Sequence, residues 1–199
     1  MMIKPVSGLC NMRCTYCFYC DEMRSRQTAA YGAMSEETLE NLIRRAFAYA
    51  DGSVTLAFQG GEPTLAGADY FRKVLMLEKR YNSRRLPVAH ALQTNGLHMD
   101  DDMLSVLEEG RFLVGLSMDG TQALHDSRRL DAAGKGTWSR VQETAQKLRR
   151  CGIEYNVLCV VDHAAAQQGE TLFHSLKEHG YLQFIPVWTR WMESRSPGA

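Results

Sequence analysis

Hydrophobic and polar positions divide the chain into two kinds of segment that alternate. Short apolar runs predict β-strands at residues 3–6, 53–58, 88–94, 112–118, 153–161 and 182–186. Between them, segments whose apolar residues recur every three or four positions predict helices at residues 35–50, 68–81, 100–109, 137–150 and 168–180. Ser35 suits the N-cap of the first helix, and Glu36 and Glu37 complement the dipole of its first turn.

This order of elements predicts an α/β fold built from six βα-type repeats, with a parallel sheet and the helices outside it. The strand runs are read as apolar on both faces, which is typical of buried parallel strands. Six repeats are too few for a closed eight-stranded barrel, so we expect an open, partial (β/α)6 barrel. Function is then expected on the loops after the strands, and the chemically unusual segments, a cysteine loop, "QGGEPT", "NG" and "DGT", do follow strands.

Composition narrows the class of protein. The chain has 199 residues, 45% of them hydrophobic, which suits a soluble globular domain. Lys plus Arg and Asp plus Glu are both 23, so nothing suggests nucleic acid or a membrane surface as a partner. No long apolar run or signal peptide is recognised, and the cytoplasm is the expected compartment. Six cysteines in a reducing compartment indicate metal binding or catalysis before disulfides.

The cysteines at the start of the chain carry the most specific signal. Cys10, Cys14 and Cys17 are spaced C-x3-C-x2-C, and Cys20 repeats the last interval. A structural zinc site would want a fourth ligand, usually from a second close pair, and no such pair follows. Three thiolates suit a [4Fe–4S] cluster that keeps one iron open for a ligand. We expect Cys20 to be a free thiol rather than an alternative ligand, because a fourth thiolate would block that iron.

At Cys10, Cys14, Tyr16 and Cys17 the sequence resembles the radical S-adenosylmethionine (SAM) superfamily, whose signature is C-x3-C-x-Φ-C with Φ aromatic. The resemblance implies that the open iron binds the amino and carboxylate groups of the methionine moiety. An electron from the cluster then cleaves the cofactor and gives a 5′-deoxyadenosyl radical. Tyr16 is expected to pack beside the cluster or the adenine.

Three further segments look like cofactor-binding motifs of that superfamily. "GGEP" resembles the motif whose backbone meets the methionine amino group, so Gly60, Gly61 and Glu62 are expected there, with the acid able to receive an ammonium. Ser117 in "SMDG" is expected near the ribose. In "HDSRR", the register favours Arg129 over Arg128 as the partner of the cofactor carboxylate.

Three polar residues at strand ends are weaker candidates for contact with the substrate. Gln59 is expected either to face the barrel mouth or to bond to nearby backbone. Thr94 and Asn95 belong to "QTNG". In the subfamily of radical SAM enzymes that the chain resembles, described next, this segment lies near the substrate, although "NG" is also a common turn pair.

The phrases "PVSGLCNMRCTYCFY", "LAFQGGEPTLAG", "LQTNGL", "VGLSMDG" and "GYLQFIP" together resemble anaerobic sulfatase-maturating enzymes over residues 2–186. The resemblance implies oxidation of a sulfatase Cys or Ser to Cα-formylglycine. The implied partners are a peptide or unfolded sulfatase and an electron donor such as ferredoxin or flavodoxin. Two alternatives stay open: a radical SAM enzyme that modifies a natural-product peptide, and an inactive frameshifted remnant that only binds cluster and cofactor.

The end of the chain departs from that family. Residues 1–186 are expected to form the radical SAM catalytic domain. Family members continue into a SPASM domain that carries two auxiliary clusters and the proton-accepting Asp, and this chain contains neither, so it is interpreted as truncated. Residues 187–199, "VWTRWMESRSPGA", match neither strand nor helix and are hypothesised to be out of frame.

Overall fold

The computed structural model describes residues 1–187 and contains one sheet of six parallel strands. The strands lie side by side in the order of the sequence, so each crossover leads to the next position in the sheet. Their bounds are β1 Met2–Ile3, β2 Val54–Phe58, β3 Val88–Thr94, β4 Phe112–Ser117, β5 Tyr155–Val161 and β6 Leu182–Pro186. β1 and β6 each pair with one neighbour, which confirms the predicted open, partial (β/α)6 barrel.

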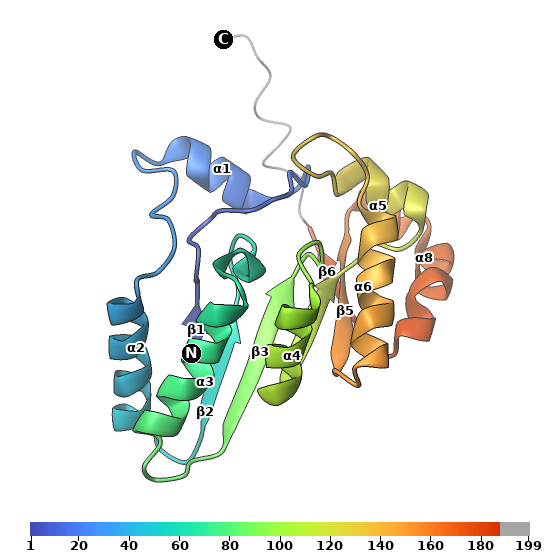
Figure 1. Cartoon of the computed structure of the whole chain (residues 1–199). Coiled ribbons are helices and arrows are strands. Elements are labelled where there is room, and N and C mark those ends of the chain that lie inside the picture. The colour runs from blue at the N-terminus through green and yellow to red at the C-terminus, as the bar shows by residue number, and fades with distance from the viewer. Residues whose placement is uncertain (188–199) are drawn as a thin grey trace.

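Most of the helices that connect the strands cover one face of the sheet, whereas α1 (Phe18–Ser25) and α5 (Gln122–Arg128) lie near the carboxyl ends of the strands (Figure 1). The α-helices are α1 Phe18–Ser25, α2 Glu36–Tyr49, α3 Ala68–Tyr81, α4 Asp101–Glu109, α5 Gln122–Arg128, α6 Trp138–Arg150, α7 His163–Ala166 and α8 Gly169–Leu176. Two short 3₁₀ helices are η1 Pro63–Ala66 and η2 Lys177–His179. Among residues 1–187, no helix is long and apolar enough to cross a membrane.

The hydrophobic core lies between this helical layer and the sheet. In β2 to β5 every second residue points into it, and Leu56, Phe58, Val114, Leu116 and Val157 are fully buried there. This alternation follows from the two-residue period of a strand. Packing of the core holds the strands in place. The loops at the carboxyl ends of the strands, which carry the predicted site, are held in place with them.

The opposite face of the sheet differs from the expectation that the strands are apolar on both sides. It is hollowed, with a volume of about 180 Å³, and small or polar side chains line it together with a few apolar ones. We call this region the sheet hollow; the residues that characterise it are Ala57, Gln59, Ala91, Gln93, Gly115, Asn156, Leu158 and Gln183. An open barrel has an inner face that helices do not cover, which explains why polar side chains occur in it.

Most predicted elements are confirmed within one or two residues, including α3 and β3 at their predicted bounds. Ser35 caps α2, where its side chain accepts a hydrogen bond from the Thr38 amide. The sequence reading missed α1, α5 and α7, because these short helices show no clear apolar period. Of the hypothesised out-of-frame tail, residues 188–199 lie outside the described residues; the amide of Val187 donates to Val161 O at 2.9 Å.

Candidate cofactor site

The cysteine loop, residues 7–17, crosses the carboxyl ends of the strands, where the turn after β2 is its first support. The amide of Glu62 donates to Leu9 O at 2.8 Å. Gly61 has a φ of +57°, and a Cβ there would lie 2.2 Å from Leu9 O. The close approach of the cysteine loop therefore requires glycine at position 61. Gly60 has a φ of +99°, and its missing Cβ leaves room for the side chain of Lys4. Binding of the cofactor by Gly60 and Gly61 stays a prediction.

The Glu62 carboxylate is 1% exposed and accepts four hydrogen bonds from the protein. Oε1 accepts from the amide of Thr64 at 3.0 Å, from its hydroxyl at 2.8 Å and from the Thr94 hydroxyl at 2.8 Å. Oε2 accepts from the Asn95 amide at 2.6 Å. Burial raises the pKa of Glu62, and these donors oppose that shift. Protein donors therefore already surround the side chain that was expected to receive an ammonium, and the contact of Glu62 with the cofactor stays a prediction.

The turn after β3 is the second support of the cysteine loop. The side-chain amide nitrogen of Asn95 lies 2.8 Å from Asn11 Oδ1 and 3.6 Å from Cys10 Sγ. Its oxygen accepts from the Leu97 amide at 2.9 Å. Thr94 donates to Glu62 and accepts from the Gly96 amide at 3.0 Å. Thr94 and Asn95, predicted as weak substrate contacts, are thus buried and bonded to the protein.

The segment after β4 is the third support. The amides of Arg13 and Thr15 donate to Leu130 O at 2.7 Å and Arg128 O at 2.9 Å. Tyr16 adds a side-chain link, because its hydroxyl donates to Asp119 Oδ2 at 2.5 Å and accepts from Arg129 Nη1 at 2.6 Å. The predicted packing of Tyr16 beside cluster or adenine stays a prediction, and the structure adds this role for its hydroxyl.

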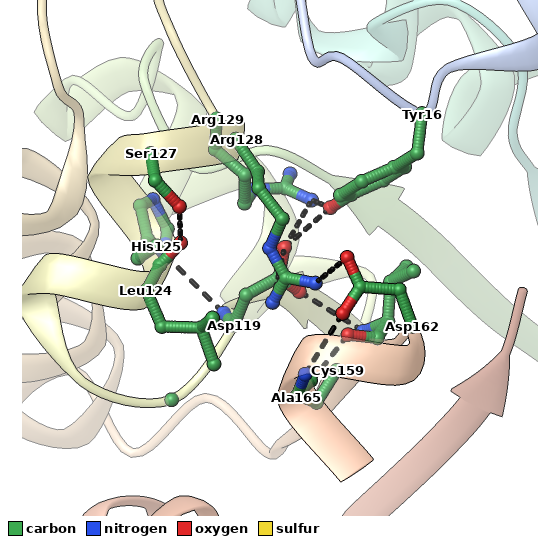
Figure 2. Close-up of polar contacts among 12 residues, drawn as sticks. Tyr16, Asp119, Leu124, His125, Ser127, Arg128, Arg129, Cys159, Asp162 and Ala165 are labelled. Atoms are coloured by element: carbon green, nitrogen blue, oxygen red, sulfur yellow. Dashed lines mark hydrogen bonds and ion pairs between the residues drawn. The ribbon is translucent and has the colours of Figure 1, made fainter. Parts of the chain in front are cut away.

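Figure 2 shows the network of buried charges that Tyr16 joins. Asp119 is fully buried, and its Oδ1 accepts from the Val160 amide at 2.9 Å. Arg128 Nη2 and Arg129 Nη1 lie 3.9 and 4.0 Å from Asp119 Oδ2. Arg128 Nη1 lies 3.0 Å from Asp162 Oδ2, without the geometry of a hydrogen bond. Two guanidinium groups and two carboxylates thus balance each other at the ends of β4 and β5.

His125 braces this network as a neutral ring (Figure 2). The Thr137 hydroxyl donates to Arg129 O at 2.8 Å, so it must accept from His125 Nε2–H at 2.9 Å. Nδ1 is then the acceptor for the Asp119 amide at 3.3 Å. Burial, helped by the two neighbouring arginines, lowers the pKa of His125 to about 3.

The predicted cluster ligands are half-buried free thiols. Cys17 is the N-cap of α1, and Cys10 and Cys14 precede it in the loop. Burial raises the pKa of Cys10 to about 11, opposed by the Met12 amide, which donates to Sγ at 3.3 Å. Burial also raises the pKa of Cys14, while Arg129 lowers it. A metal bound by these sulfurs must therefore displace protons.

The thiols influence one another's pKa but, within residues 1–187, no three His, Cys, Asp or Glu side chains have the geometry of a metal site. Cys20 lies on α1, and burial together with Cys17 raises its pKa to about 11. The ligand roles of the three cysteines and the free state of Cys20 stay predictions.

Ser117, predicted to bind the ribose, ends β4, and its hydroxyl oxygen accepts from Gln93 Nε2 at 2.9 Å. Gln93 crosses β4 over Gly115, where an added Cβ would lie 2.2 Å from Gln93 Oε1. No acceptor for the Ser117 hydroxyl proton occurs among residues 1–187, so this proton can point to a ligand. Gln59 is half-buried at the rim of the sheet hollow.

Sequence reasoning missed Asp119, Gln93 and the burial of Arg128. Asp119 stands in the quoted "SMDG" phrase, so the signal was present, but only its partners in the fold reveal its role. Gln93 lies two residues after Ala91, and both face the sheet hollow. The two-residue period of a strand, applied to β3, would have predicted this placement.

The chemistry of these residues fits the predicted cofactors. Three thiols share one loop, as a cluster with one open iron needs. Close by, the Nε atom of Arg129 and all three guanidinium nitrogens of Arg128 are buried without a hydrogen-bond partner in the described part of the chain. Buried cationic donors that lack a hydrogen-bond partner fit an anionic group such as a carboxylate. Of the two side chains, that of Arg129 donates a hydrogen bond to the Tyr16 hydroxyl and lowers the pKa of Cys14, which links it to the cysteine loop.

Comparisons with known proteins show the family and the fold to which the chain is similar. The Radical SAM superfamily model matches residues 5–172. The cysteine-type anaerobic sulfatase-maturating enzyme of Clostridium novyi (strain NT) is 42% identical over 188 residues, covering 94% of this chain and 50% of the relative. The serine-type enzyme of Klebsiella aerogenes is 32% identical over 192 residues, covering 94% and 46%. Native anSMEcpe, solved with bound AdoMet and the Kp18Cys peptide, has a TM-score of 0.88 and 39% identity, covering 94% and 51%.

The chain thus spans about half the length of the curated relatives it matches. The family match extends over the cysteine loop and four of the six strands, β2 to β5. The chain therefore belongs to the radical SAM superfamily, whose cofactors are S-adenosylmethionine and a [4Fe–4S] cluster.

Proposed function

We propose that this chain carries the radical SAM chemistry of an anaerobic sulfatase-maturating enzyme, which oxidises a sulfatase Cys or Ser to Cα-formylglycine. The observation that carries the proposal is the 42% identity with a cysteine-type enzyme over 94% of the chain. The proposed setting is the cytoplasm, with a peptide or unfolded sulfatase as substrate and ferredoxin or flavodoxin as electron donor. Residues 1–186 form the proposed catalytic domain.

The cluster and S-adenosylmethionine, when bound, supply an electron and a radical that removes a hydrogen atom. Cys10, Cys14 and Cys17 hold the cluster in this proposal. Arg129 binds the cofactor carboxylate, and its charge is kept in place by Tyr16 and Asp119. Because two carboxylates already balance the two arginines, Nε of Arg129, which has no hydrogen-bond partner among the described residues, recognises the anion by hydrogen bonding rather than by excess charge.

The sheet hollow supplies the place for the substrate. Its carboxamide side chains come from four different strand segments and can each donate and accept a hydrogen bond. An extended peptide presents the same pairing groups along its backbone, so it can bind without a strict demand on side-chain identity. Gln59, at the rim beside the Gly60–Gly61 turn, is the proposed contact nearest to the cofactor.

The identity is higher with the cysteine-type relative, at 42%, than with the serine-type one, at 32%. A sulfatase peptide with Cys at the target position is therefore the first substrate to test. The full chain is reconstituted anaerobically with iron and sulfide, reduced, and incubated with S-adenosylmethionine and the Cys, Ser or Ala form of the peptide. Mass spectrometry of the peptide and chromatography of 5′-deoxyadenosine are the readouts.

We expect 5′-deoxyadenosine with all three peptides and no formylglycine from this chain alone, because loss of the second electron and of the proton is assigned to the part of the relatives that the chain does not span. Formylglycine from the Cys or the Ser peptide would refute that assignment and leave the cofactor chemistry standing. A reconstituted chain that produces neither would support the alternative of a remnant that only binds the cofactor.

A further inference from the structure

The side-chain amide of Asn95 has a fixed orientation toward the cysteine loop. Its oxygen accepts from the Leu97 amide at 2.9 Å, so the nitrogen must face the other way. That nitrogen carries two hydrogens, one for Asn11 Oδ1 at 2.8 Å and one for Cys10 Sγ at 3.6 Å. Both hydrogens are thus used inside the protein, which leaves no donor on this side chain for a substrate.

A buried acid holds Asn95 at this place. The Asn95 backbone amide donates to Glu62 Oε2 at 2.6 Å, and the same carboxylate binds the hydroxyl of Thr94 at 2.8 Å. Asn95 itself is 6% exposed. Glu62, after the end of β2, therefore holds Asn95, after the end of β3, in contact with Cys10. This contact is made by a buried side chain.

Hydrogen bonds to the sulfurs are among the factors that set the reduction potential of an iron–sulfur cluster. Reduction adds negative charge, part of which falls on the ligand sulfurs, so an N–H donor stabilises the reduced state more than the oxidised state. We propose that Asn95 raises the reduction potential of the cluster by donating a hydrogen bond to the Cys10 sulfur. The Met12 amide, 3.3 Å from the same sulfur, is a second donor that side-chain substitution leaves in place.

This inference rests on the proposed ligand role of Cys10 and not on the identity of the peptide substrate. The experiment is an anaerobic redox titration of the reconstituted full chain, followed by electron paramagnetic resonance of the reduced cluster. Asn95→Asp keeps the shape and replaces the donor with a charged acceptor, and Asn95→Ser shortens the side chain. Asn41→Asp makes the same chemical change on the exposed face of α2 and serves as the matched control.

Asn95→Ser is expected to lower the equilibrium constant for one-electron reduction about three- to tenfold, the range of one hydrogen bond. At 59 mV per factor of ten, this is a shift of about 30–60 mV to more negative potential. Asn95→Asp is expected to shift it further in the same direction, and Asn41→Asp to leave it unchanged.

Equal potentials in wild type and both Asn95 variants would overturn the proposal. Loss of the cluster from both variants would also overturn it, because Asn95 would then serve cluster assembly. A cluster that survives Cys10→Ala would instead refute the ligand assignment on which the inference rests, so the two failures are distinguishable.

Discussion

Removal of the Tyr16 hydroxyl tests whether the cysteine loop is tied to the end of β4 by its side chain. Tyr16→Phe removes the hydrogen bond donated to Asp119 Oδ2 and the one accepted from Arg129 Nη1. The Oδ2 atom is then left with guanidinium nitrogens at 3.9 and 4.0 Å, beyond hydrogen-bond distance. A buried carboxylate oxygen would lose its only close donor in the described part of the chain.

The magnitude follows from the two bonds and from what can replace them. Each hydrogen bond to a charged group is worth about 1.5–3 kcal/mol, so two bonds set an upper limit of about 3–6 kcal/mol. Arg129 and Asp119 need to move by only about 1 Å to pair directly once the hydroxyl is gone. Their new contact recovers part of the loss, and we expect a net destabilisation of about 2–3 kcal/mol.

The free energy of unfolding is measured by urea titration of the apo protein under reducing, anaerobic conditions. Tyr19→Phe is the control: it removes a hydroxyl three residues away, whereas the contact of Tyr19 with Lys4 uses the ring, 4.9 Å from Nζ. It should change stability by less than about 0.5 kcal/mol. A double-mutant cycle with Asp119→Asn should give a coupling energy of at least about 1 kcal/mol. If Tyr16→Phe costs no more than Tyr19→Phe, the hydroxyl does not tie the loop.

Three further predictions concern the cofactors and the buried network. Arg129→Ala should weaken S-adenosylmethionine binding by about 1.5–3 kcal/mol in calorimetry of the reconstituted protein, and a larger loss in Arg128→Ala would reverse the assignment. Alanine at any predicted cluster ligand should abolish bound iron, whereas Cys20→Ala should retain it; iron analysis decides both. The pKa of His125 is lowered to about 3 in the folded protein, against an ordinary 6.5 in the unfolded chain. The folded protein therefore has its full stability above pH 6.5 and loses stability as the pH falls from 6.5 toward 3, because only the unfolded chain binds the proton in that range. His125→Gln should therefore reduce the loss of unfolding free energy between about pH 7.5 and about pH 5.5 by about 1.4 kcal/mol, as followed by urea titration at both values.

The fold could be predicted because its signals are local. A helix such as α3 shows its apolar period within its own residues, and the cap of α2 is visible as Ser35 followed by Glu36 and Glu37. Strand order follows from the βα alternation, since each repeat adds a parallel neighbour. α5 was not predicted because its buried residues are polar. His125 and Arg128 are buried by contacts with residues of other segments, which the local sequence does not show.

The candidate site also has some features that the sequence shows and others that only the folded structure shows. The spacing of the three cysteines is a property of the sequence, and so is a glycine turn followed by an acid. The accepting atoms of Glu62, however, are occupied by Thr64, Thr94 and Asn95, and two of these lie more than thirty positions away. A one-dimensional reading cannot tell an acid that awaits an ammonium from one that already has its donors.

These long-range contacts give the two flanks of the cysteine loop different physical roles. On one flank, Glu62 holds Asn95, and Asn95 reaches the sulfur of Cys10. On the other flank, Asp119 and Tyr16 hold Arg129, whose charge lowers the pKa of Cys14. The first flank delivers a neutral dipole. The second delivers the charge of Arg129, which outweighs the opposing effect of Asp119 at Cys14, so an anion bound to Arg129 acts mainly on the second flank. A cofactor carboxylate that pairs with Arg129 would therefore change the electrostatic field at Cys14 more than the hydrogen bond at Cys10.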